Sequence, residues 1–233
     1  MEELIKITLW AFSGVGILLF PPVRRFLIST WQRIFRREFL PDNLNFRTRK
    51  IYHNDLERIS EMANYYLRQG HGISSQSVEQ WSLNNSDIFR IVECKDNDNS
   101  DWSFCGYYSV LPLSPAAASL LRQSKIQDFD LTKDVFLSFD DPNLKEIYIM
   151  DLMTNYKRCK KRHCCKLAGT ILIRNLRNFI TTLKTRNPHI EKVFSIIASE
   201  NGQRLAERSG FKKKLDFKSP YGWKLYEIEM TNV

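Results

Sequence analysis

The feature that most constrains the fold is a short segment near the C-terminus, residues 193–211. An apolar, β-prone run covers residues 193–198, and the polar stretch Ser199–Gly210 after it favours a short helix. Gly210 is placed to end that helix, because helices commonly stop at a left-handed residue and glycine adopts this conformation without strain. Phe211 then returns the chain to the core. The segment predicts strand, short helix, glycine stop and strand, as found in domains that mix helices with a sheet.

The rest of residues 45–233 alternates strand and helix patterns without an internal repeat, which predicts one α/β (α+β) domain. Strands are expected at 45–51, 88–94, 102–111, 145–154, 193–198 and 222–230. Helices are expected at 54–67, 77–83, within 112–141, at 167–182 and around 199–209. The strand at 145–154 is apolar on both faces, so we expect it at the centre of the sheet.

The net charge of +9 is spread unevenly. Residues 1–50 hold nine basic and four acidic side chains, residues 51–140 seven and thirteen, and residues 141–233 nineteen and nine. The basic C-terminal part suits a polyanionic ligand such as a nucleotide cofactor. The acidic middle part argues against a continuous nucleic-acid surface, so we expect no nucleic-acid partner.

The five cysteines are irregularly spaced, which favours reduced thiols over a disulfide framework. The cluster Cys159, His163, Cys164 and Cys165 lacks a second ligand pair, and adjacent cysteines point apart. We therefore expect no bound metal.

The N-terminal segment reads as a membrane span. Leu4–Val23 holds one charged residue and has about the 20 residues needed to cross a bilayer. Arginines come directly after it, which predicts a cytoplasmic location for the C-terminal side. The sequence thus predicts a membrane-spanning helix at 1–23, a basic amphipathic juxtamembrane segment at 24–44 and a globular domain at 45–233, in a single-pass membrane protein. The alternative is a soluble N-terminal helix that packs on the domain.

Two segments resemble the GCN5-related N-acetyltransferase (GNAT) superfamily. The helix at 199–211 resembles the family's last cofactor-side helix and matches it at Arg204, Glu207, Arg208, Gly210 and Phe211. The strand at 145–154, followed by His163–Ala168 and a long helix, resembles the family's strand, phosphate-binding loop and helix. His163 stands where the family usually has glutamine or arginine, and Lys166 stands where it has its first glycine. The resemblance implies a mixed, mostly antiparallel sheet flanked by helices.

The resemblance also implies a co-substrate, acetyl-CoA or another acyl-CoA. A loop entering a helix presents several N–H groups to one point, where the helix dipole favours a diphosphate. The implied cofactor-binding residues are Leu152, Thr154, His163, Cys164, Cys165, Lys166, Leu167, Ala168, Gly169, Thr170 and Asn201. The alternative for the basic residues at 157–166 is a solvated loop.

For the chemistry, an amine acceptor must lose a proton before it attacks a thioester, and a carboxylate can accept that proton. Glu146 and Asp151 on the central strand are the candidate bases, unless both are ordinary solvated carboxylates. Many members of the family have a tyrosine that protonates the leaving thiolate, and Ala206 stands at its expected position here. Possible substitutes for that tyrosine are Tyr148, Tyr221 and Tyr226. The sequence predicts a membrane-tethered N-acetyltransferase acting on an unidentified amine by direct attack. The alternative is a non-catalytic acyl-CoA-binding regulatory module.

Overall fold

The structure is a computed structural model that describes residues 44–67, 72–96, 101–155 and 162–230. The predicted membrane-spanning helix at 1–23 and nearly all of the predicted segment at 24–44 lie outside the described residues. The domain boundaries drawn there therefore stay a prediction. Asn45–Val233 forms one compact unit.

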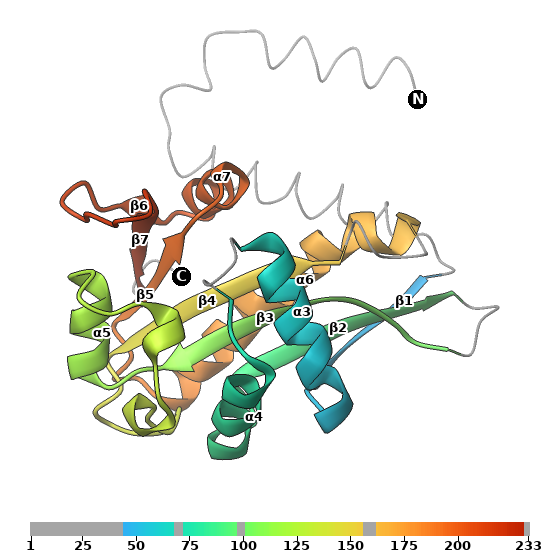
Figure 1. Cartoon of the computed structure of the whole chain (residues 1–233), viewed down its shortest axis with the longest axis horizontal. Coiled ribbons are helices and arrows are strands. Elements are labelled where there is room, and N and C mark those ends of the chain that lie inside the picture. The colour runs from blue at the N-terminus through green and yellow to red at the C-terminus, as the bar shows by residue number, and fades with distance from the viewer. Residues whose placement is uncertain (1–43, 68–71, 97–100, 156–161, 231–233) are drawn as a thin grey trace, which may run out of the picture. The chain divides into compact units, whose positions relative to one another are not determined.

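One seven-stranded sheet forms the centre of this unit, in the order β1-β2-β3-β4-β5-β7-β6 (Figure 1). Its strands are β1 (Leu44–Lys50), β2 (Phe89–Asp96), β3 (Ser103–Pro112), β4 (Glu146–Thr154), β5 (Lys192–Ile197), β6 (Lys212–Lys213) and β7 (Lys224–Glu229). The pair β4–β5 is parallel, whereas β2–β3, β3–β4, β5–β7 and β6–β7 are antiparallel. This confirms the predicted mixed, mostly antiparallel sheet with 145–154 near its centre.

Helices cover both faces of the sheet (Figure 1). They are α3 (Leu56–Tyr66), α4 (Ser75–Asn84), α5 (Pro115–Arg122), α6 (Arg162–Arg186) and α7 (Glu200–Arg208), with short 3-10 turns η2 (His53–Asp55), η3 (Asp128–Asp130) and η4 (Lys133–Val135). Adjacent residues of β3 show the two layers. Tyr107 is fully buried in the core that α3, α4 and α5 form with the sheet. The ring of Tyr108 lies 6.2 Å from that of Phe179 on α6, on the opposite face.

A β-bulge interrupts the pairing of β4 with β3. Ser109 pairs with Asp151 and Val110 pairs with Ile149, so Met150 has no partner on β3. An extra residue shifts the alternation of the strand by one position. The bulge thereby places Asp151 on the same face as Tyr107, which it contacts.

One local prediction is wrong, and one strand is not predicted. The helix expected at 167–182 extends over Arg162–Arg186, so His163, Cys164, Cys165 and Lys166 are helical and not part of a loop. No glycine or proline separates Arg162 from Leu167, and the intervening residues carry only small helix penalties. The sequence also misses the two-residue strand β6, because a segment this short has no detectable period.

The predicted single-pass membrane localisation is corrected. Within residues 44–67, 72–96, 101–155 and 162–230, no helix combines the length and the apolar composition that a bilayer crossing needs. The longest, α6, has 25 residues, but charged side chains such as Arg174 and Arg177 interrupt its apolar positions. The segment 1–23, on which the prediction rests, lies outside the described residues.

Candidate functional site

The central strands β4 and β5 pair only at one end. Glu146, Ile147 and Tyr148 of β4 pair with Lys192, Val193 and Phe194 of β5. Beyond these pairs β4 continues to Thr154 and β5 to Ile197, without further pairing between them. Backbone groups on these facing edges lack the partners that a sheet would supply, and such groups require hydrogen bonds from another source.

A cavity of about 710 Å³ opens where the two strands part. It is lined by the ends of β4 and β5, by one side of α6, by α7 and by the C-terminal end of α3. Most lining side chains are apolar, and the acidic residues among them are Asp128 and Asp151. A volume of this size falls within the usual range for small-molecule sites.

The segment at 199–211 forms one wall of the cavity as the sequence predicts. Ser199 caps α7, its Oγ accepting a hydrogen bond from the N–H of Gly202 at 3.1 Å. A Cβ at Gly202 would lie 2.7 Å from Cγ2 of Ile197, so glycine permits α7 to approach the end of β5. Gly210 has a φ of +90°, which confirms the expected glycine stop. The N–H of Phe211 then donates to the carbonyl of Ala206 at 3.0 Å.

Asp151 is the buried acidic group of the cavity, with 6% of its surface exposed. Its Oδ2 accepts a hydrogen bond from the hydroxyl of Tyr107 at 3.1 Å, and its N–H donates to Oγ of Ser109 at 3.0 Å. Burial raises the pKa of Asp151 to about 7, and the charge of Asp128 acts in the same direction. The hydrogen bonds from Tyr107 and Ser109 lower this pKa and only partly oppose the rise.

Asp128 belongs to the η3 turn and is the second carboxylate of the cavity. Its Oδ2 accepts a hydrogen bond from the hydroxyl of Tyr148 at 3.2 Å, and its Oδ1 accepts one from the N–H of Phe129 at 3.0 Å. Burial raises the pKa of Asp128, while both hydrogen bonds lower it. Tyr107 and Tyr148 are fully buried, and burial raises the pKa of each hydroxyl well above its ordinary value. Both tyrosines therefore act as hydrogen-bond donors to the carboxylates.

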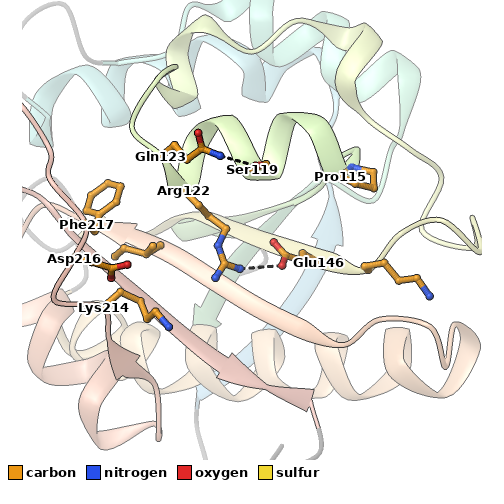
Figure 2. A pocket seen from close by; sticks show the side chains of 10 residues that line it. Pro115, Ser119, Arg122, Gln123, Glu146, Lys214, Asp216 and Phe217 are labelled. Atoms are coloured by element: carbon orange, nitrogen blue, oxygen red, sulfur yellow. Dashed lines mark hydrogen bonds and ion pairs between the residues drawn. The ribbon is translucent and has the colours of Figure 1, made fainter.

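The two carboxylates predicted on β4 lie in different environments. Asp151 lines the cavity between the parted strands, whereas Glu146 lies at the paired end. Glu146 lines a separate cavity of about 370 Å³, where its Oε1 accepts a hydrogen bond from Nη1 of Arg122 at 2.9 Å (Figure 2). Arg122 also pairs with Glu227 on β7. Glu146 is thus held in an ion-pair network apart from the parted strands.

The predicted cofactor residues fall into two groups. Leu152, Thr154 and Asn201 line the cavity. The remaining predicted residues occupy the start of α6: His163, Cys164, Cys165, Lys166, Leu167, Ala168, Gly169 and Thr170. Ala168 is fully buried, and a Cβ on Gly169 would lie 3.7 Å from Cγ2 of Thr154. The first turns of α6 therefore lie against the end of β4.

Of the tyrosines considered as proton donors, none lines the cavity within the described residues. Tyr148 donates to Asp128, and Tyr226 donates to Oε1 of Glu207 at 3.0 Å. The ring of Tyr221 lies 5.1 Å from that of Trp223. Ala206 does line the cavity, at the position where the family's tyrosine is expected.

Sequence reasoning misses Asp128 and Tyr107. Asp128 comes from a connecting segment without periodicity, and nothing in its neighbours indicates that it returns to the sheet. Tyr107 reads as one more apolar position of a strand. Within the described part of the chain, no group of three or more histidine, cysteine or acidic side chains could hold a metal ion.

No protein family model and no curated protein matches the chain. Among solved structures, the loading GNATL domain of CurA from Lyngbya majuscula is similar with a TM-score of 0.52 at 9% sequence identity, over 81% of this chain and 100% of that chain. NAA60 from Arabidopsis thaliana in complex with acetyl-CoA has a TM-score of 0.48 at 13% identity, over 80% and 99% of the two chains. Ard1 from Thermoplasma volcanium has a TM-score of 0.48 at 11% identity, over 79% and 97%.

The likeness to the GNATL domain confirms the GNAT fold that the sequence predicts. At these identities the likeness concerns the fold alone, and one fold hosts many activities.

Proposed function

We propose that this protein is an acyl-CoA-dependent N-acyltransferase that transfers an acetyl group from acetyl-CoA to an amine by direct attack. The observation that carries the proposal is the parting of β4 and β5 over a cavity that contains Asp151. The acyl donor and the acceptor amine would meet in this cavity.

The parted strands suit the extended arm of an acyl-CoA. Its two amide groups can pair with a strand edge as a neighbouring strand would, and the edge of β4 beyond Tyr148 has no partner on β5. Leu152 and Thr154 belong to that edge and line the cavity. The diphosphate would then bind at the start of α6, where the backbone N–H groups of a helix N-terminus favour an anion. Asn201 would contact the arm from α7.

Asp151 supplies the base in this proposal. A group with a pKa of about 7 is partly ionised at neutral pH and still basic enough to accept a proton from an amine. The amine nitrogen attacks the thioester carbonyl, and a backbone N–H stabilises the resulting oxyanion. The carbon–nitrogen bond forms, the carbon–sulfur bond breaks, and the proton that Asp151 takes from the amine passes to the leaving thiolate. Glu146 has no such role, because Arg122 holds it outside the cavity.

Paired substitutions in α7 test the binding step. Asn201 lines the cavity, whereas its neighbour Glu200 does not and has 87% of its side chain exposed. We expect Asn201→Trp to weaken acetyl-CoA binding at least about tenfold in calorimetry, which corresponds to about 1.4 kcal/mol. Glu200→Trp adds the same bulk one position away and should leave the affinity within about twofold. The absence of acetyl-CoA binding to the unmodified protein at millimolar concentration would exclude the proposal.

The second candidate is a non-catalytic acyl-CoA-binding module. Ala206 favours it, because the cavity wall offers no tyrosine at the position that supplies a proton in many members of the family. Release of free thiol from acetyl-CoA in the presence of a panel of amines separates the two candidates. Binding without amine-dependent thiol release would favour the module over the enzyme.

A further inference from the structure

The wall of the cavity next to η3 contains two carboxylates, of which the proposed reaction uses only Asp151. Asp128 and Asp151 both line the cavity, and each accepts a hydrogen bond from a fully buried tyrosine. Neither carboxylate forms an ion pair with a basic side chain of the described residues. Most carboxylates buried in proteins have a cationic partner, so the arrangement calls for a physical reason.

We propose that Asp128 is a positioning residue for Asp151, and that the two carboxyl groups share a single negative charge at neutral pH. This inference rests on the proposed function, because it concerns the residue that serves there as the base. Two like charges in one apolar site cannot both ionise at low cost, so the first proton leaves more easily than the second. The shared charge keeps Asp151 able to accept and release a proton near neutral pH.

The geometry fixes which carboxylate holds the charge first. Both carboxylates accept hydrogen bonds that favour the ionised form, Asp128 from Tyr148 and the N–H of Phe129, and Asp151 from Tyr107. Their exposure differs, because Asp128 is only half-buried. Asp151 is buried and lies on the bulged strand that borders the parted edge. When the pair holds one proton, that proton therefore resides mainly on Asp151. Asp151 becomes able to accept the amine's proton once it ionises, at its pKa of about 7. Burial, followed by the charge of Asp128, raises the pKa of Asp151 in agreement with this assignment.

Other titratable groups lie around the two carboxylates and affect their ionisation. They are Tyr107 on β3, Tyr148 on β4, Asp130 on η3, Tyr66 on α3 and Arg177 on α6. Asp130 adds to the negative charge near Asp128. Arg177 lines the cavity from the α6 side and forms no ion pair with either carboxylate of the described structure. The two buried tyrosines stay neutral over the working range because burial raises the pKa of the hydroxyls of Tyr107 and Tyr148.

The test is a titration of the Asp151 carboxyl by carbon-13 NMR in the full-length protein, with assignment by Asp151→Asn. Asp128→Asn removes the neighbouring charge but keeps the shape and the acceptor for Tyr148. We expect this change to lower the midpoint of the Asp151 titration by about one pH unit or more. Asp134→Asn removes a charge from the same connecting segment at an exposed position and should leave the midpoint unchanged.

A second variant guards against misfolding of the first. Tyr148→Phe keeps the ring that stacks on Phe194 at 5.0 Å but removes the hydrogen bond that favours the ionised form of Asp128. Asp128 then holds a proton more tightly, and the Asp151 midpoint should move in the same direction as in Asp128→Asn. In the thiol-release assay, the acidic limb of the pH–rate profile should shift to lower pH by a similar amount, with little change in KM for acetyl-CoA.

The two readouts separate this inference from the proposed function. An Asp151 midpoint that is the same in the unmodified protein and in both variants would overturn the inference, even if the protein released thiol. Loss of thiol release in every form, together with the expected NMR shift, would support the charge sharing and count against the acyltransferase. An Asp151 that titrates below pH 5 in the unmodified protein would also overturn the inference.

Discussion

Two acidic pairs in this domain hold the same chemical groups in opposite electrostatic states. Asp55 and Glu93, 3% and 5% exposed, are joined by Arg49, whose Nη1 lies 2.5 Å from Asp55 and whose Nη2 lies 2.7 Å from Glu93. Their hydrogen bonds to Arg49 help to outweigh burial and lower the pKa of both carboxyls. Asp128 and Asp151 have tyrosine hydroxyls in place of the guanidinium, and burial raises their pKa.

The contact partner decides whether a buried carboxylate keeps its charge near neutral pH. A carboxylate with a cationic partner stays charged across the neutral range and cannot exchange a proton there. A carboxylate that only hydroxyl and N–H groups contact, without a cation, can retain a proton near pH 7 and exchange it. The exposed fractions of Glu93 and Asp151 are nearly equal, and the cation beside Glu93 is a contact that Asp151 lacks among the described residues.

The largest effect should come from Asp151→Asn. Loss of a general base costs about 10²–10⁴-fold in turnover, and we expect such a loss in kcat for thiol release. Asparagine can still accept the hydrogen bond from Tyr107, so the fold and the affinity for acetyl-CoA should be retained. Glu146→Gln on the same strand is the matched control, and it should leave kcat within about twofold. An equal loss in both variants would mean that the effect does not depend on lining the cavity, which would count against Asp151 as the base.

The structural pair should respond through stability. Arg49→Met removes the cation shared by Asp55 and Glu93. Asp55 then loses its ion-pair partner among the described residues, whereas Glu93 keeps Arg47 at 2.7 Å. Breaking a buried ion pair costs about 3–5 kcal/mol, which should appear as a lower free energy of unfolding in urea. Arg204→Ala, in an exposed pair with Glu200 at 3.6 Å, should change it by less than about 1 kcal/mol. A stable Arg49→Met protein would show that the cation is dispensable.

The smallest effect is a pH dependence of stability with opposite signs in the two regions. Asp55 and Glu93, whose pKa is lowered on folding, contribute stability at neutral pH that is lost as the pH falls below about 4. Asp151, whose pKa is raised to about 7, contributes stability at low pH that is lost as the pH rises from about 4 to 7.

Unfolding in urea between about pH 3 and pH 8 checks both signs. The unmodified protein should lose roughly 2–4 kcal/mol between pH 4 and pH 7 relative to Asp151→Asn, because each pKa unit corresponds to about 1.4 kcal/mol. Parallel pH profiles for the two proteins would contradict the raised pKa. Below about pH 4 both proteins should lose stability together, since each retains Asp55 and Glu93.

The sequence predicts the helices and strands around the cavity better than it predicts which acidic residues line it. Local signals mark the elements of the segment at 193–211, because an apolar run marks its strand and a glycine marks the end of its helix. The segment folds as expected. The sequence marks Asp151 as a candidate but cannot tell it from Glu146, because nothing local marks the bulge at Met150. That bulge arises from register against β3, which is a property of two strands together.

Long-range placement accounts for most of what the sequence does not predict. Asp128 reaches the cavity from a 3-10 turn, and no periodic pattern marks such a residue as part of a site. The sequence places the start of α6 at Leu167 instead of Arg162, because helix propensities between these residues differ too little to mark a boundary. Both features depend on tertiary packing more than on local sequence.

The short contact between β4 and β5 has a mechanical consequence. Three residue pairs, from Glu146–Lys192 to Tyr148–Phe194, join β1–β4 to β5–β7 among the described strands. The N–H groups of Glu191 and Lys192 extend the junction by donating to the carbonyl of Lys145. An extended molecule bound between the unpaired edges of β4 and β5 would contact both strands and hold the two halves of the sheet together. The rigidity of the sheet would then rise with the concentration of that molecule, because a ligand stabilises the state to which it binds.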